Sequence, residues 1–159
     1  MCMNCNAPNG RRVVITGLGA VSAIGVGRDA YWESLKEGRS GIKKISSFDT
    51  TSYPCDVAGE ITDFDPADFM TTQQARRIDR FAQLAIAAAK LGIADAELEI
   101  TPANQSSVGM ILGTSLGTLC YLEQQLALLN EKGLKRINPF FPTSVIPSSA
   151  ATQVMLELK

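Results

Sequence analysis

The strongest constraint on the fold is that only two segments of this chain are predicted to be full core strands. Residues 12–16 and 107–112 are short runs dominated by apolar residues, and each leads into a glycine-rich turn and a helix. Two strands cannot form a sheet large enough to be covered by several helices. The order of elements therefore indicates an α/β fold, and we interpret the chain as part of a larger domain.

Helices are predicted over four segments: residues 30–37, 72–91, 119–130 and from about 146 onward. The second of these carries an apolar stripe with the spacing of one helix face. Its stretch 85–89 is rich in alanine, so another element is expected to pack closely there. We expect an aromatic loop over residues 135–144 and a short strand near residues 57–61.

Composition and charge exclude several classes of protein. The chain has 159 residues, a net charge of −1 and 45% hydrophobic residues, which fits one folded domain and excludes a disordered chain. A general nucleic-acid binder would need a basic excess. No apolar run is long enough for a transmembrane helix, and the first residues lack the apolar core of a signal peptide. We therefore expect a cytoplasmic protein that binds neither nucleic acid nor membrane.

The chain contains no histidine. This excludes every Ser-His, Cys-His and His-metal mechanism that the chain could perform alone. Cys2 and Cys5 have the spacing of a metal or redox pair, but a structural zinc site needs four ligands and no second such pair follows. We predict no metal site and no cofactor, and residues 1–10 are expected to be a disordered or ragged N-terminus.

The first glycine-rich turn resembles a dinucleotide-binding fingerprint only in part. Gly17 and Gly19 occupy its first two glycine positions, but Ser22 stands at the third. No acidic residue ends a second strand about 20 residues later, as the fingerprint requires. We therefore predict that these glycines permit a tight turn beside a packed core.

The second glycine-rich turn matches the nucleophile-elbow pattern of hydrolases. Gly113, Ser115 and Gly117 have the required spacing between a strand and a helix. A hydrolase serine needs a base, and the chain has no histidine to supply it. Cys120 follows in the predicted helix and is expected to be a small buried apolar residue, because nothing nearby would lower its pKa.

Six short segments form one ordered pattern: residues 11–25, 31–42, 48–50, 76–81, 108–117 and 138–141. Among them are Arg76-Arg-Ile-Asp-Arg-Phe81 and Asn138-Pro-Phe-Phe141. The pattern resembles the N-terminal part of the discrete β-ketoacyl-acyl-carrier-protein synthases of fatty-acid synthesis. The resemblance implies a thiolase-like layered α/β fold, of which residues 11–159 would form the N-terminal half, incomplete and ending before the nucleophile.

The resemblance also implies a reaction that this chain cannot complete. Members of the family work as homodimers and condense an acyl chain, held on a cysteine, with malonyl carried on acyl carrier protein. Two histidines stabilise the charge that develops. The chain has no histidine, and none of its four cysteines matches the nucleophile. We therefore assign no catalytic residue and expect a fragment that is inactive alone.

Two residues are expected to border the acyl pocket. Leu116 matches the family position beside the acyl tunnel, where a branched apolar side chain limits chain length. Phe141 matches the aromatic residue that reaches across the dimer interface toward the partner's tunnel.

Four basic residues match positions that receive acyl carrier protein: Arg76, Arg77, Lys135 and Arg136. Clustered cations on a near-neutral protein steer an acidic partner, so this expectation is physically reasonable. An ordinary solvated surface remains the alternative interpretation of both basic pairs.

The sequence departs from the family near residue 148. Ser148 replaces the usual asparagine, and Thr152 stands where glycine is common. A polyketide-type synthase therefore stays open. So does a non-catalytic partner subunit, similar to a chain-length factor, that binds carrier protein or a complete synthase and forms a heterodimer.

Overall fold

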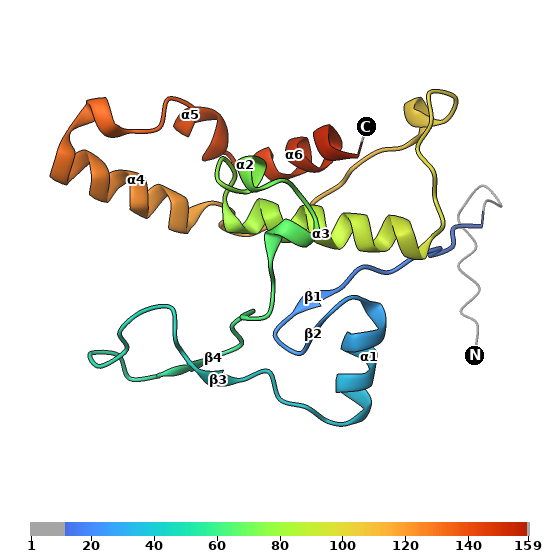
Figure 1. The fold of residues 1–159 in the computed structure, drawn as a ribbon, viewed down its shortest axis with the longest axis horizontal. Helices are drawn as coiled ribbons and strands as arrows, with labels where there is room; N and C mark the ends of the chain where they lie inside the picture. The colour runs from blue at the N-terminus through green and yellow to red at the C-terminus, as the bar shows by residue number, and fades with distance from the viewer. Residues whose placement is uncertain (1–11, 159) are drawn as a thin grey trace.

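The structure is a computed structural model and describes residues 12–158 (Figure 1). The expectations for Cys2, Cys5 and residues 1–10 fall outside the described residues. The α-helices are α1 (Arg28–Lys36), α2 (Thr72–Ala75), α3 (Arg80–Asp95), α4 (Leu119–Lys132), α5 (Phe141–Ser144) and α6 (Ser149–Glu157). The 3₁₀ helices are η1 (Pro66–Asp68), η2 (Gln105–Ser107) and η3 (Leu134–Arg136). The strands are β1 (Val21–Ser22), β2 (Gly25–Val26), β3 (Lys43–Lys44) and β4 (Val57–Ala58).

The core lies between α3 and α6, which run side by side in Figure 1. Ile86 of α3 and Val154 of α6 are buried against each other's helix and against Met70. Ala85 and Ala89 of α3 pack against this cluster, and their small side chains let the two helices approach closely. The close packing expected at the alanine-rich stretch is therefore confirmed.

The single helix predicted over residues 72–91 is wrong, because the chain forms two helices there. α2 has a capping box in which Thr71 and Gln74 exchange hydrogen bonds, and it ends at Ala75. A turn follows, and the Asp79 carboxylate accepts a hydrogen bond from the Arg80 N–H at 2.6 Å to begin α3. Two N-terminal caps this close together divide the apolar stripe into two helices.

The prediction of two buried core strands is also wrong. Residues 12–19 and 108–113 run without regular hydrogen bonding, and within residues 12–158 neither belongs to a sheet. Ile15 is 84% exposed and Ile111 is 97% exposed. A β-branched run is buried only when neighbouring strands and a covering layer are present, and the described residues supply neither.

The strands that do form are two short antiparallel pairs. β1 pairs with β2, with Val21 opposite Val26, and β3 pairs with β4, with Lys43 opposite Ala58. β4 confirms the short strand expected near residues 57–61. Both pairs lie on the side of α3 away from α6 in the view of Figure 1.

The C-terminal third differs from expectation in detail. The expected aromatic loop over residues 135–144 contains η3 and the single turn of α5, and the last helix begins at Ser149 instead of near residue 146. α4 extends the predicted helix to Lys132, and Gly133 ends it with a φ of 75°. No helix within the described residues is long and apolar enough to span a membrane.

Candidate functional site

One face of α4 holds the aromatic loop in place. The Thr118 hydroxyl donates a hydrogen bond of 2.6 Å to the backbone carbonyl of Val145. Seven residues along the helix, the side-chain oxygen of Gln125 accepts a hydrogen bond of 2.9 Å from the Asn138 N–H. Thr118 is 3% exposed and Gln125 is 7% exposed, so both polar side chains are buried for these bonds. The loop that carries the predicted site residues is therefore fixed to α4 at two points.

An aromatic contact lies between these two hydrogen bonds. The rings of Tyr121 and Phe141 have their centroids 6.1 Å apart and are tilted by 44°. Phe141 is half-buried at the start of α5. Thr118, Tyr121 and Gln125 recur at three and four residues, which places them on one face of the helix. Sequence reasoning missed this row of side chains, although its spacing could have revealed it.

Leu116 lies apart from this contact. It occupies the turn before α4 and is 69% exposed. Gly117 follows with a φ of 58°, in the left-handed region that glycine adopts without strain. The two residues expected at the acyl pocket therefore lie on different elements, Leu116 in the turn before α4 and Phe141 at the start of α5, and neither lines the cavity beside Arg77 described below.

The four basic residues form two separate exposed pairs. Arg76 and Arg77 lie in the turn between α2 and α3, whereas Lys135 and Arg136 lie in η3, beyond the far end of α4 (Figure 1). Within the described residues none of the four forms an ion pair. The structure thus leaves both pairs free to meet an acidic partner but does not join them into one patch.

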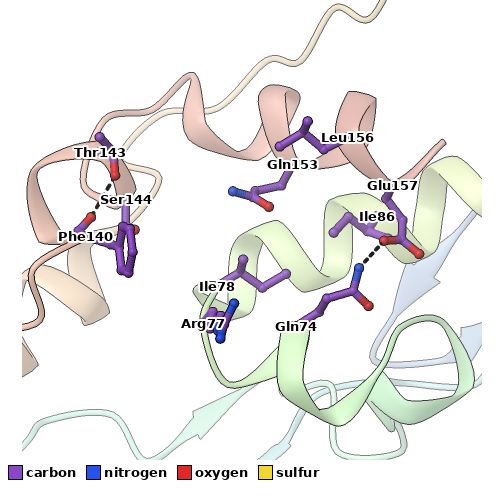
Figure 2. A pocket seen from close by; sticks show the side chains of 10 residues that line it. All are labelled: Gln74, Arg77, Ile78, Ile86, Phe140, Thr143, Ser144, Gln153, Leu156 and Glu157. Carbon is purple, nitrogen blue, oxygen red and sulfur yellow. Dashed lines mark hydrogen bonds between the residues drawn. The ribbon is translucent and has the colours of Figure 1, made fainter. Parts of the chain in front are cut away.

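A cavity of about 300 Å³ opens beside Arg77, between the turn that precedes α3 and the helices α5 and α6 (Figure 2). Its walls combine polar and apolar side chains: Gln74, Arg77, Ile78, Ile86, Phe140, Thr143, Ser144, Gln153, Leu156 and Glu157.

One wall of this cavity is fixed by a charged network. Glu157 of α6 accepts a hydrogen bond of 2.6 Å from the Gln74 side chain and forms an ion pair of 2.5 Å with the Lys90 ammonium of α3. Lys90 also donates to the Phe69 carbonyl. The hydrogen bond from Lys90 lowers the pKa of Glu157 below its ordinary value. The charged Glu157 carboxylate therefore joins α6 to α2 and α3. A carboxylate held in this form is a poor proton donor near neutral pH.

The first glycine-rich turn serves packing. A Cβ on Gly19 would lie 1.9 Å from the Ala88 carbonyl oxygen, and one on Gly17 would lie 2.3 Å from the Gly92 carbonyl oxygen. The Leu18 N–H, which could otherwise meet a phosphate, donates to the Asp95 carboxylate at 2.8 Å. This geometry confirms the packing interpretation of these glycines, since the turn lies on α3 with an acidic group beside it.

The candidate nucleophiles lack the environment that activation requires. Cys120 is exposed on α4, so the expectation that it is buried is wrong. Ser115 precedes α4 in an exposed turn, and no histidine exists in the chain to serve as its base. Among residues 12–158 no three His, Cys, Asp or Glu side chains gather as a metal site would require. Within residues 12–158 the structure therefore shows two exposed basic pairs and a cavity beside Arg77, and it pairs neither Ser115 nor Cys120 with a base.

Comparison with known proteins agrees with this arrangement. The family model described as the β-ketoacyl synthase N-terminal domain matches residues 10–159. The chain belongs to the β-ketoacyl synthase family. Its extended segments, glycine-rich turns and α4 all fall inside the matched region.

Curated relatives are longer than this chain. It is 39% identical over 148 residues to 3-oxoacyl-acyl-carrier-protein synthase 2 of Synechocystis sp., covering 93% of this chain and 36% of that protein. It is 40% identical over 141 residues to the synthase of the same name from Vibrio harveyi, covering 89% of this chain and 34% of that one. The chain therefore spans about a third of the length of these relatives.

Solved structures share the fold. The ishigamide ketosynthase/chain length factor superposes with a TM-score of 0.74 at 30% identity, covering 93% of this chain and 37% of that one. A β-ketoacyl synthase from Burkholderia phymatum superposes with a TM-score of 0.72 at 24% identity, covering 91% and 36%. The expected fold class, an incomplete thiolase-like α/β fold, is confirmed, since the chain covers only 37% and 36% of these two proteins.

Proposed function

We propose that this chain is the N-terminal part of a cytoplasmic condensing enzyme that joins acyl and malonyl groups carried on acyl carrier protein, and that it does not condense them alone. The match of residues 10–159 to the β-ketoacyl synthase N-terminal domain carries the proposal. Decarboxylative condensation needs a nucleophile for the acyl group and donors that stabilise the developing oxyanion. The chain has no histidine, and with two exposed cysteines residues 12–158 offer neither arrangement.

The first test is direct. The chain is incubated with acyl- and malonyl-carrier protein, and products are separated by mass. We expect no 3-oxoacyl product above a boiled control, whereas a full-length synthase that begins with this chain should form it. Turnover by the chain alone would overturn the assignment of catalysis to the rest of the enzyme.

Carrier protein is proposed to dock on the two basic pairs. They are exposed and lack ion-pair partners within the described residues, so binding an acidic surface costs them no existing contact. Arg76 and Arg77 lie in the turn between the C-terminus of α2, where a positive charge is favourable, and the N-terminus of α3, where it is unfavourable. These two dipole effects oppose each other, whereas a shared acidic partner accounts for both basic pairs.

The docking test compares two charge reversals of equal size. In the full-length synthase, R76E with R77E should raise the Kd for acyl carrier protein about tenfold at low salt and flatten its dependence on salt. Reaction with a free acyl thioester should change little. K43E with K44E alters the net charge equally at another exposed site, on β3, and should leave the Kd nearly unchanged. Equal losses from both double variants would show a general charge effect.

Leu116 and Phe141 are proposed to border the acyl pocket. An exposed leucine in a glycine-bounded turn is available to line a tunnel completed by another part of the enzyme. In the full-length synthase, L116F should exclude long acyl chains before short ones, because added bulk in a packed tunnel is poorly tolerated. A product profile identical to that of the unmodified enzyme would place Leu116 outside the tunnel.

A second candidate function is a non-catalytic partner subunit that pairs with a complete synthase. It is favoured by the similarity to the ishigamide ketosynthase/chain length factor and by Ser148 and Thr152, which depart from the usual residues. Such a subunit would form a heterodimer and leave product formation to its partner. Mass measurement of the complex in solution, with product formation assayed for each subunit separately, distinguishes it from a homodimeric enzyme.

A further inference from the structure

The hydroxyl of Tyr121 is a buried polar group without a hydrogen-bond partner. It is the buried side-chain polar atom that remains unsatisfied among the described residues. A buried hydroxyl that lacks a partner destabilises the fold relative to the same ring without the hydroxyl. A native structure that retains such a group calls for an explanation in function, strain or an absent ligand.

Two neighbours of Tyr121 on α4 form hydrogen bonds, whereas the Tyr121 hydroxyl does not. Thr118 and Gln125 flank Tyr121 on the same helix face, and each reaches a backbone group of the opposite loop. The tyrosine ring contacts only the ring of Phe141 among aromatic side chains that the structure describes. A phenylalanine at position 121 would preserve this contact, so packing against Phe141 does not require the hydroxyl.

The aromatic residue that packs against the Tyr121 ring can move. Phe141 is half-buried and begins α5, which is a single turn. The two hydrogen bonds to α4 fix the loop at Asn138 and Val145, on either side of Phe141. The loop can therefore keep its position while the Phe141 ring changes rotamer and opens a path to the hydroxyl.

We propose that Tyr121 determines acyl specificity by donating a hydrogen bond from its hydroxyl to an oxygen carried on the acyl chain. This inference rests on the proposed function, in which Phe141 borders the acyl pocket. When the acyl chain enters, the Phe141 ring that packs against the Tyr121 ring turns aside. A keto or hydroxyl oxygen on the chain then pairs with the tyrosine, whereas a saturated chain leaves it unpaired. The preferred substrate class is therefore an oxygenated acyl chain.

The test uses the full-length synthase and the variant Y121F, which removes only the hydroxyl. The substrates are acyl-carrier thioesters of one chain length: one saturated, and others with a keto oxygen at successive positions. We expect Y121F to lower kcat/KM about tenfold for at least one keto substrate, equivalent to about 1.4 kcal/mol, while the saturated substrate is processed as well or better. Y53F removes an exposed hydroxyl on the loop between β3 and β4 and serves as the matched control.

A stability measurement separates this role from a structural one. Because the hydroxyl has no partner in the folded protein, Y121F should melt at the same temperature as the unmodified protein or higher. A lower melting temperature would show that the hydroxyl is paired within the fold and would overturn the inference. An unchanged preference between keto and saturated substrates would do the same.

Failure of the inference is distinguishable from failure of the proposed function. Turnover of the saturated substrate by the unmodified synthase supports the proposed function whatever Y121F does. An unchanged substrate ratio in Y121F then refutes the role of Tyr121 alone. If the unmodified protein processes none of the thioesters, both the proposed function and the inference are refuted.

Discussion

The helical pair α3–α6 and the extended segments 12–19 and 108–113 contain equally apolar stretches but reach opposite outcomes. Across the helical pair, Ile86, Ala87 and Val154 are buried. Along the extended segments, Ile15 and Ile111 point largely into solvent. A helix satisfies its backbone hydrogen bonds internally and needs one partner face, whereas a strand needs neighbours on both edges and cover on its faces. The chain can therefore complete its helical core but not its sheet.

The largest expected effect concerns the glycine-rich turn, where the first extended segment packs tightly on α3. G19A puts a Cβ against the Ala88 carbonyl, where 1.9 Å is available, so the segment must leave α3. We expect a loss of about 3 kcal/mol in the free energy of unfolding, measured by urea titration of the helical circular dichroism signal. G109A is the matched control in the other segment, where nothing lies within 4 Å of the added atom. Equal losses from the two would contradict the packing described for Gly19.

A smaller loss of stability is expected in the helical pair than from G19A, and almost none in the extended segment. V154A removes two methyl groups from the core of the helical pair and should cost about 2 kcal/mol. I111A removes more atoms from an exposed side chain and should cost less than about 0.5 kcal/mol in this chain.

The same two variants sharpen the comparison in the full-length synthase. If the rest of the enzyme covers the sheet, I111A should there cost about as much as V154A. A cost for I111A that stays small in the longer protein would show that its segment is exposed in the complete fold as well.

The smallest effect tests the charged contact that joins the helical pair. K90M leaves Glu157 without its ion-pair partner and should cost about 1–2 kcal/mol at pH 7. K36M removes an exposed pair with Glu33 and should cost under about 0.5 kcal/mol.

The pH dependence of this effect has a defined sign. Lys90 lowers the pKa of Glu157 in the folded state, so the stabilisation is present above the ordinary glutamate pKa and is lost as pH falls through the lowered value. The difference between K90M and the unmodified chain should therefore shrink as the pH falls below the ordinary glutamate pKa. A difference independent of pH would assign the loss to the hydrogen bond from Lys90 to the Phe69 carbonyl instead of the ion pair with Glu157.

The sequence predicted elements that depend on local signals. α1 and α4 end close to their predicted glycine stops, Gly38 and Gly133, although neither helix begins with a side-chain cap. Gly17 and Gly19 were expected to serve packing. The division of the long helix was missed because its apolar stripe continues across the turn at Arg76–Asp79. Two local signals, the Thr71–Gln74 capping box and the Asp79 cap, mark the true boundaries.

Features that depend on residues distant in the sequence could not be predicted from local signals. Burial of residues 12–16 was inferred from composition, but it depends on strands that the described residues do not include. The proposed site residues came from family resemblance, and no local pattern distinguishes Arg76 from any surface arginine. Tyr121 differs, because its spacing from Thr118 and Gln125 marks one helix face, and only the structure shows that its hydroxyl lacks a partner.

The pairing of α3 with α6 also determines when the helical core can form during translation. About fifty residues separate the end of α3 at Asp95 from the start of α6 at Ser149. At typical rates of about 5–20 residues per second, a ribosome needs roughly 3–10 s to supply the second helix after the first. An isolated helix of this length is marginally stable in water, so α3 must persist during that time as a fluctuating segment. Two of the α3 residues that pack on the core shared with α6, Ala85 and Ala89, are alanines. Before α6 is synthesised, these positions expose little apolar surface that could associate with other chains.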